Sequence, residues 1–93
     1  MASEKICEKN GYWLMFVQAK LLKGVERGFF IAMEEKRAKP FLALEKPTVL
    51  DFSEKDTVSY LVNDDIAKAK ISAIEYFQKY FFIQRAMPLR VSP

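Results

Sequence analysis

The sequence contains no histidine, one cysteine and three glycines among its 93 residues. The absence of histidine excludes Ser-His-Asp and Cys-His nucleophilic catalysis, together with most imidazole acid–base chemistry. With Cys7 as the single cysteine, one chain cannot build a structural zinc site of the Cys/His type. The glycines stand at positions 11, 24 and 28, and this spacing matches neither a P-loop nor a dinucleotide-binding motif. The sequence therefore predicts a protein that is not an enzyme and that holds no cofactor and no metal.

The lone cysteine also excludes a disulfide within the chain, which favours a reducing compartment over secretion. No signal peptide is evident, and no apolar run approaches the roughly 20 residues that a membrane-spanning helix needs. We therefore expect a soluble, intracellular, cytoplasmic protein without a membrane partner.

Charge of either sign is not in large excess. Fifteen Lys and Arg stand against 12 Asp and Glu, a formal net charge of +3, which permits nucleic acid as a partner without requiring it. The length fits a single domain over residues 1–93, with disorder expected first at the ends, residues 1–10 and 88–93. Eight Phe, four Tyr and one Trp are a heavy aromatic content for this length and favour a packed core or an oligomer.

The clearest structural signal is a long helix over Asn63–Gln84. Asn63 and Asp64 are suited to cap its first turn, and Pro88 predicts that it ends near Arg85. Apolar residues recur at three- and four-residue spacing along this helix, which places them on one inward face: Ile66, Ala69, Ala73, Ile74, Phe77, Tyr80 and Phe81.

Further apolar residues flank that face, among them Tyr76, Phe82 and Ile83. One interpretation is a wide core contact with some exposed aromatic residues, which is common in proteins. The other is a second buried surface, most simply a subunit interface. On the second interpretation we predict a homodimer through Tyr76, Phe82 and Ile83.

The first half of the chain has the composition of strands. Tyr12–Leu22 is apolar at every odd position, while its even positions become polar along the chain, so we predict a strand with its odd face in the core. A helix is the alternative, but Gly24 and Gly28 would lie inside it. Lys23–Gly28 reads as a turn and Phe29–Lys36 as the returning strand.

The middle of the chain is less distinct. Phe41–Lys46 reads as a third strand after a turn that ends at Pro40, and Thr48–Phe52 as a short fourth strand. Residues 54–62 fit a short helix capped by Ser53, and they fit a β-strand equally well. Ser3 could cap a short helical turn that Asn10-Gly11 would end, and fraying is the alternative.

The fold class indicated by these elements is α+β: an antiparallel β-meander of three to five strands with one long C-terminal α-helix packed on one face. We expect the even positions of the first two strands to face away from that helix. This face would then carry aromatic and basic residues together, as surfaces for single-stranded nucleic acid do. The candidate nucleic-acid-binding residues are Lys20, Lys23, Arg27, Phe30, Lys36, Arg37 and Lys39.

Two functions remain after these exclusions. The first is a small non-enzymatic binding module that acts through protein–protein interaction with another chain, most simply its own copy. The alternative is a module that binds single-stranded nucleic acid or RNA through the exposed sheet face. An acidic metal-dependent nuclease site is disfavoured, because no carboxylate is suitably placed upstream of Glu34-Glu35-Lys36.

Overall fold

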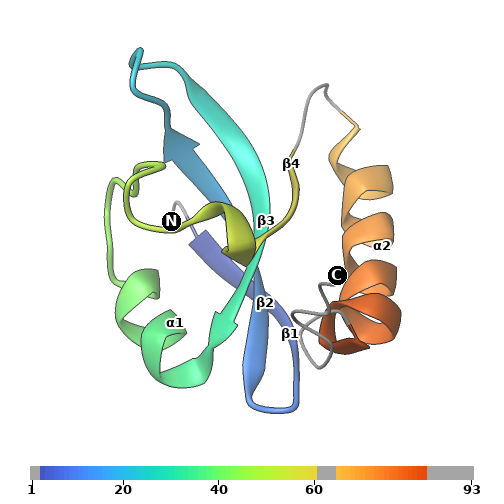
Figure 1. The fold of residues 1–93 in the computed structure, drawn as a ribbon. Coiled ribbons are helices and arrows are strands. Elements are labelled where there is room, and N and C mark those ends of the chain that lie inside the picture. Colours follow the sequence, from blue (N-terminus) through green and yellow to red (C-terminus); the bar gives the residue numbers. More distant parts are fainter. Residues whose placement is uncertain (1–2, 61–64, 84–93) are drawn as a thin grey trace, which may run out of the picture.

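The fold is α+β, in which helices cover the two sides of one antiparallel sheet (Figure 1). A computed structural model describes residues 3–60 and 65–83. The sheet has four strands in the order β1-β2-β3-β4, so each strand pairs with its neighbour in sequence. The strands are β1 (Ser3–Lys9), β2 (Tyr12–Lys20), β3 (Glu26–Glu34) and β4 (Thr57–Tyr60). The meander and the terminal helix predicted from the sequence are confirmed.

The first strand corrects the prediction for the N-terminal segment. Ser3–Lys9 pairs with β2 and is neither a helical turn nor frayed. Asn10 and Gly11 both have positive φ, 52° and 79°, the conformation of a two-residue hairpin turn. Asn-Gly joins two strands here because its backbone twist matches theirs, so the same dipeptide that suggested a helix end marks a hairpin.

The segment after β3 is a helix and not the predicted turn and third strand. α1 (Glu35–Leu42) contains Pro40, and its buried residues are Ala38 and Phe41. Ala38, Phe41 and Leu42 have the spacing of one helical face, and all three belong to or pack against one core. Pro40 suggested a break in the sequence, but packing of this face overrides its local cost.

The predicted fourth strand at Thr48–Phe52 is also absent. This segment makes one isolated parallel bridge, between Thr48 and Lys20, and then turns. The ambiguous segment after it resolves into a 3₁₀ turn, η1 (Glu54–Asp56), and strand β4. Val58 of β4 packs against the core on the side of the C-terminal helix.

The C-terminal helix begins at α2 (Ile66–Tyr76) and continues as a π-helical turn, η2 (Phe77–Phe81). Its N-cap is Asp65, whose carboxylate accepts a hydrogen bond from the Lys68 main-chain N–H at 3.0 Å. The caps predicted at Asn63 and Asp64, and the end predicted near Arg85, lie outside the described residues.

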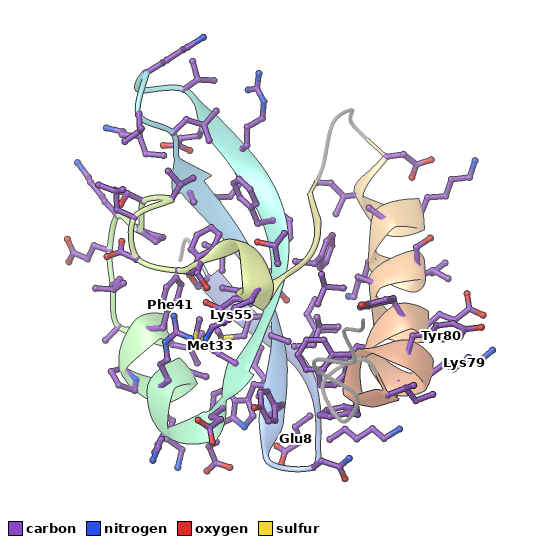
Figure 2. All side chains as sticks on the ribbon, in the orientation of Figure 1. Glu8, Met33, Phe41, Lys55, Lys79 and Tyr80 are labelled. Carbon is purple, nitrogen blue, oxygen red and sulfur yellow. The ribbon has the colours of Figure 1, made fainter. Side chains whose placement is uncertain are left out.

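Two cores lie on opposite sides of the sheet, and this arrangement reverses the predicted faces. The odd residues of β2 and β3, such as Met15 and Ile31, pack beneath α1. The even residues, such as Leu14 and Phe30, pack beneath α2 and η2. Figure 2 shows Met33 and Phe41 between the sheet and α1, while Tyr80 lies on the outer side of the C-terminal helix. The two central strands are therefore buried on both faces.

The π-helical turn changes which residues of the C-terminal helix face inward. Ala73, Phe77 and Phe81 are buried as predicted, whereas Tyr80 within the turn is exposed. Ile66 is exposed as well, but it lies at the start of α2, before the turn. A π turn contains one residue more than an α turn and so shifts the register of the residues after it. Phe82 consequently packs against the core, with its ring 5.6 Å from Tyr12 and 5.3 Å from Phe77. Lys9 of β1 donates a hydrogen bond to the Gln78 carbonyl within this turn at 2.5 Å.

We predict that Phe77→Ala lowers the free energy of unfolding by about 3–5 kcal/mol, because it leaves a cavity beneath the π turn. Phe77 is fully buried between the sheet and the aromatic rings of Phe81 and Phe82. Denaturant titration measures the loss, and Tyr80→Ala on the same turn is the control. A loss below about 1 kcal/mol for Phe77→Ala would show that this face is not the core.

Candidate functional site

A polar constellation joins α1 to the turn before β4. The Arg37 guanidinium donates two hydrogen bonds to the Asp56 carboxylate, Nη1 to Oδ1 at 3.0 Å and Nη2 to Oδ2 at 2.9 Å. Asp56 also accepts from the Ser53 main-chain N–H at 2.9 Å and from the Ser53 hydroxyl at 3.1 Å. Such a bidentate pair fixes both position and orientation of its partners.

Asp56 is buried, whereas Arg37 is partly open to solvent. Burial is the largest single influence on the pKa of the Asp56 carboxyl and raises it, but the hydrogen bonds from Arg37 and Ser53 together outweigh burial and lower that pKa below its ordinary value. The hydrogen bond to Asp56 in turn raises the pKa of Arg37. Asp56 is thus an ionised acceptor with its oxygens occupied, and its role is to fasten two segments together.

The structure divides the predicted nucleic-acid-binding residues into two groups at opposite ends of β3. Lys20, Lys23 and Arg27 lie at the end of the β2–β3 hairpin and are exposed. The other basic residues, Lys36, Arg37 and Lys39, lie on α1. Lys39 pairs with Glu35 at 2.9 Å and Arg37 pairs with Asp56, so two of these three charges are locally neutralised.

The expectation of an open aromatic sheet face is wrong. Phe30 is fully buried in the core beneath α2, and Phe16 packs against it with ring centroids 5.0 Å apart. The C-terminal helix covers this face because the even positions at its centre, Leu14 and Phe30, are as apolar as the odd ones. A base has no access to Phe30, so the predicted stacking platform does not exist.

The predicted interface residues also separate. Tyr76 and Phe82 are half-buried and pack against their own core, whereas Ile83 is exposed. Tyr80, which was expected inside, lies outside with its ring 6.2 Å from that of Tyr76. The exposed residues of the helix end are therefore Tyr80 and Ile83, and half-buried Tyr76 lies beside them. We call these three residues the helix surface.

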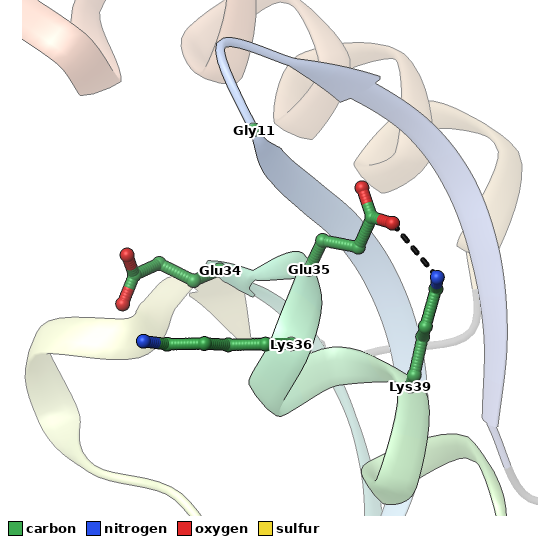
Figure 3. A pocket seen from close by; sticks show the side chains of 5 residues that line it. All are labelled: Gly11, Glu34, Glu35, Lys36 and Lys39. Atoms are coloured by element: carbon green, nitrogen blue, oxygen red, sulfur yellow. Dashed lines mark ion pairs between the residues drawn. The ribbon is translucent and has the colours of Figure 1, made fainter.

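Two surface depressions are lined by described residues, and both are rich in charged side chains. The larger lies beside the start of α1 and is lined by Gly11, Glu34, Glu35, Lys36 and Lys39, with the Glu35–Lys39 ion pair along one side (Figure 3). The hydrogen bond from Lys39 lowers the pKa of Glu35. The smaller, about 120 Å³, is lined by Gln18, Lys20, Glu26, Glu45, Lys46 and Pro47. Ligand pockets are mostly apolar concavities of about 300–1,000 Å³. The larger depression, about 590 Å³, lies within that range, but four of the five residues that line it are charged, and the smaller depression lies below the range.

Metal-ligating and nucleophilic groups are dispersed over the described part of the chain. Within residues 3–60 and 65–83, no group of three or more His, Cys, Asp or Glu side chains is placed to hold a metal ion. The Cys7 thiol has a pKa raised by burial, with Lys5 acting weakly in the opposite direction. Of the helices in these ranges, none has the length and apolar character needed to span a bilayer.

Sequence reasoning missed one surface feature, a group of exposed aliphatic residues on the end of the β2–β3 hairpin and on the loop that meets Lys20 at the end of β2. Leu22 and Leu50 are 79% and 77% exposed. Each directly follows a residue that packs against the core, Leu21 and Val49 respectively. The available signal was two adjacent aliphatic pairs, one at the end of the predicted strand Tyr12–Leu22 and one inside the predicted strand Thr48–Phe52. Only one member of each pair can face inward in a strand.

The fold is a small α+β arrangement whose sheet is covered on both faces. The most exposed large apolar residues among those described lie at the hairpin end with its adjoining loop and on the C-terminal helix. Comparisons of the chain with protein-family models, with curated proteins and with solved structures find no significant match.

The Arg37–Asp56 pair generates a pH-dependent prediction. A carboxyl whose pKa is lower in the folded than in the unfolded chain stabilises the fold above its unfolded value of about 3.9, and this contribution disappears as pH falls through the lower folded value. Asp56→Asn should cost about 2 kcal/mol at pH 7, a modest value because Arg37 can turn to solvent. The gap in unfolding free energy between wild type and Asp56→Asn should close below about pH 4.

Urea titrations from pH 7 to pH 2 measure this gap. Glu75→Gln is the matched control, because Glu75 forms an exposed ion pair with Lys79 at 3.1 Å and should change stability little. If wild type and Asp56→Asn differed in unfolding free energy by the same amount at pH 2 and pH 7, the ionised Asp56 carboxylate would not be the source of the stabilisation.

The burial of Phe30 gives a second prediction for this region. Phe30→Ala should lower the unfolding free energy by about 3–5 kcal/mol, as expected for a core aromatic residue. A base-stacking residue on an open face would instead tolerate this change without loss of stability. Thermal unfolding followed by circular dichroism distinguishes the two, and an unchanged midpoint would restore the open-face interpretation.

Proposed function

We propose that the protein is a non-enzymatic binding module that acts through protein–protein interaction, with a second copy of the chain as its partner. The observation that carries this proposal is the exposure of Tyr80 and Ile83, 54% and 55%, on the outer side of a helix whose inner side is fully packed. Clustered apolar side chains on an otherwise charged surface are characteristic of interaction sites. Tyr76 lies beside Tyr80 and extends the same helix surface.

The charges beside the helix surface support self-association. Glu75 and Lys79 form an ion pair with each other at 3.1 Å. In a two-fold dimer the same patch meets itself, so an unpaired charge would face its own copy and repel it. A patch whose neighbouring charges are already paired avoids this repulsion, which favours a second copy over a partner of strong opposite charge.

The sheet edges support the helix surface as the place of contact. β1 departs from regular pairing between Lys5 and Cys7, and β3–β4 pairing shifts between Phe30 and Ile31. Bulges of this kind twist an edge strand away from further pairing, and β1 adds alternating charges that oppose it. Association through strand addition is therefore disfavoured, and association through the helix surface is favoured.

The nucleic-acid alternative has less support. Its aromatic residue Phe30 is buried, and its basic residues lie at two ends of the molecule with Arg37 and Lys39 already paired. Binding along a single strand depends on a continuous basic groove with accessible aromatic rings. The described surface offers neither feature around these residues.

The proposal is tested by sedimentation velocity over about 5–500 μM protein, a range that spans typical weak dimers. We expect the mass to rise from 10.8 kDa towards twice that value. Ile83→Glu should hold the protein monomeric with its melting temperature unchanged at low concentration. Leu22→Glu, which places the same charge at the far hairpin, is the control and should dimerise as wild type. A wild-type protein that stays monomeric throughout would contradict the proposal.

A further inference from the structure

The loop after α1 lies against the end of β2 and forms one end of the molecule with the β2–β3 hairpin. The Lys20 N–H donates to the Pro47 carbonyl at 3.0 Å, and the Val49 N–H donates to the Lys20 carbonyl at 3.1 Å. Beyond this point the hairpin turns through residues 21–25 and projects past the loop (Figure 1). Two segments far apart in sequence thus meet at the same end of the sheet.

This end exposes aliphatic side chains that the fold does not use. Leu21 and Val49 pack against the core beneath α1, and the residues directly after them, Leu22 and Leu50, are the two most exposed large apolar residues described. Val25 in the same hairpin loop is also exposed. Exposed aliphatic side chains grouped at one end of a molecule are characteristic of an interaction site.

Basic groups lie beside Leu22 and Val25. Lys23 and Arg27 are exposed on the hairpin, and Lys20 lies at its base. The nearby carboxylates are Glu26, Glu45 and Asp51. Glu26 stands directly across the strand pair from Lys20, and Asp51 accepts a hydrogen bond from the Thr48 N–H at 2.7 Å. Within the hairpin segment 20–27, which carries Leu22 and Val25, the three basic side chains outnumber the one carboxylate, Glu26, so the net charge around these two residues is positive.

We propose that this end, the tip surface formed by Leu22, Val25, Leu50, Lys23 and Arg27, binds an anionic lipid surface. The aliphatic side chains enter the interface between headgroups and acyl chains, while Lys23 and Arg27 remain at the headgroups, where anionic lipids attract them. This surface is separate from the helix surface, and the two are tested independently.

The shape of the tip surface favours lipid over a protein partner. It consists of the projecting hairpin end with Leu22 and Val25 and of the adjoining loop with Leu50, and no apolar concavity adjoins it among the described depressions. A stable protein interface buries about 800 Å² on each partner, more than such an end supplies. A fluid hydrocarbon layer needs no complementary shape, so each inserted side chain contributes separately.

The test is co-sedimentation of the full chain with phosphatidylcholine vesicles that contain about 30% phosphatidylserine, at about 2 mM lipid, since a single acyl anchor binds with about 10⁴ M⁻¹. We expect binding at about 50 mM salt that weakens at about 300 mM, and little binding to pure phosphatidylcholine. The double variant Leu22→Ser/Leu50→Ser should lower the partition coefficient about tenfold or more.

Matched variants separate the tip surface from general charge and hydrophobicity. Ile71→Ser removes an aliphatic side chain of comparable exposure, 67%, on the far helix and should bind as wild type. Lys23→Ala/Arg27→Ala should weaken binding by about tenfold, whereas Lys68→Ala/Lys70→Ala should not.

Three results would overturn the proposal. The first is no wild-type binding to anionic vesicles at low salt. The second is that Leu22→Ser/Leu50→Ser and Ile71→Ser reduce vesicle binding by the same factor. The third is a tip variant that changes the sedimenting mass without vesicle binding, which would make the tip surface a contact between protein chains.

Discussion

Burial of β2 and β3 on both faces is the constraint on which the rest of this structure depends. The paired residues at the centre of these strands, Leu14 with Ala32 and Met15 with Ile31, are almost completely buried on alternate sides. A sheet with two apolar faces must be covered twice, because either face left open would expose the aromatic and aliphatic side chains of a whole layer. Helices α1 and α2 with its π turn, together with the loop at residues 47–52, supply the two covers.

Each cover is secured to the sheet differently. On one side, the bidentate Arg37–Asp56 pair joins α1 to the turn before β4 and so ties the cover to an edge of the sheet. On the other side, the contact is apolar and combines aliphatic with aromatic residues. At the helix end, Phe81 and Phe82 contact Tyr12, and Phe77 contacts Phe82. The π turn makes this possible by bringing Phe82 inward, and the consequence is that Tyr80 and Ile83 are turned outward. The exposed helix surface is thus a product of how the core is filled.

The same requirement to cover both sheet faces bears on the apolar residues that remain exposed. Most of the chain's large apolar residues cover the two sheet faces. The few that remain exposed are not required by either core. They lie on the outer side of the C-terminal helix and at the hairpin end, and the two groups differ in their charged neighbours. Paired charges adjoin Tyr80 and Ile83, whereas basic groups adjoin Leu22 and Val25. These different surroundings are the reason that we propose a protein partner for one surface and an anionic lipid surface for the other.

The sequence by itself determined the elements whose signals are local. Alternation over Tyr12–Leu22, the glycines of the hairpin and the three- and four-residue spacing through Phe77 depend only on near neighbours, and the β2–β3 hairpin and the C-terminal helix follow from them. The exclusions drawn from the absent histidine are of the same kind, since they depend on composition alone.

Tertiary structure decided the features that depend on residues far apart. It decided that Phe30 faces a helix and not solvent, because only the position of α2 determines which side of the sheet is covered. It decided that Pro40 stays within a helix, because the contacts of Ala38 and Phe41 outweigh a local preference. It also decided that Lys20 contacts residues 47–49, because such a long-range main-chain contact has no sequence pattern. It decided that Tyr80 faces outward, because a single π turn does not alter the apolar periodicity of the sequence.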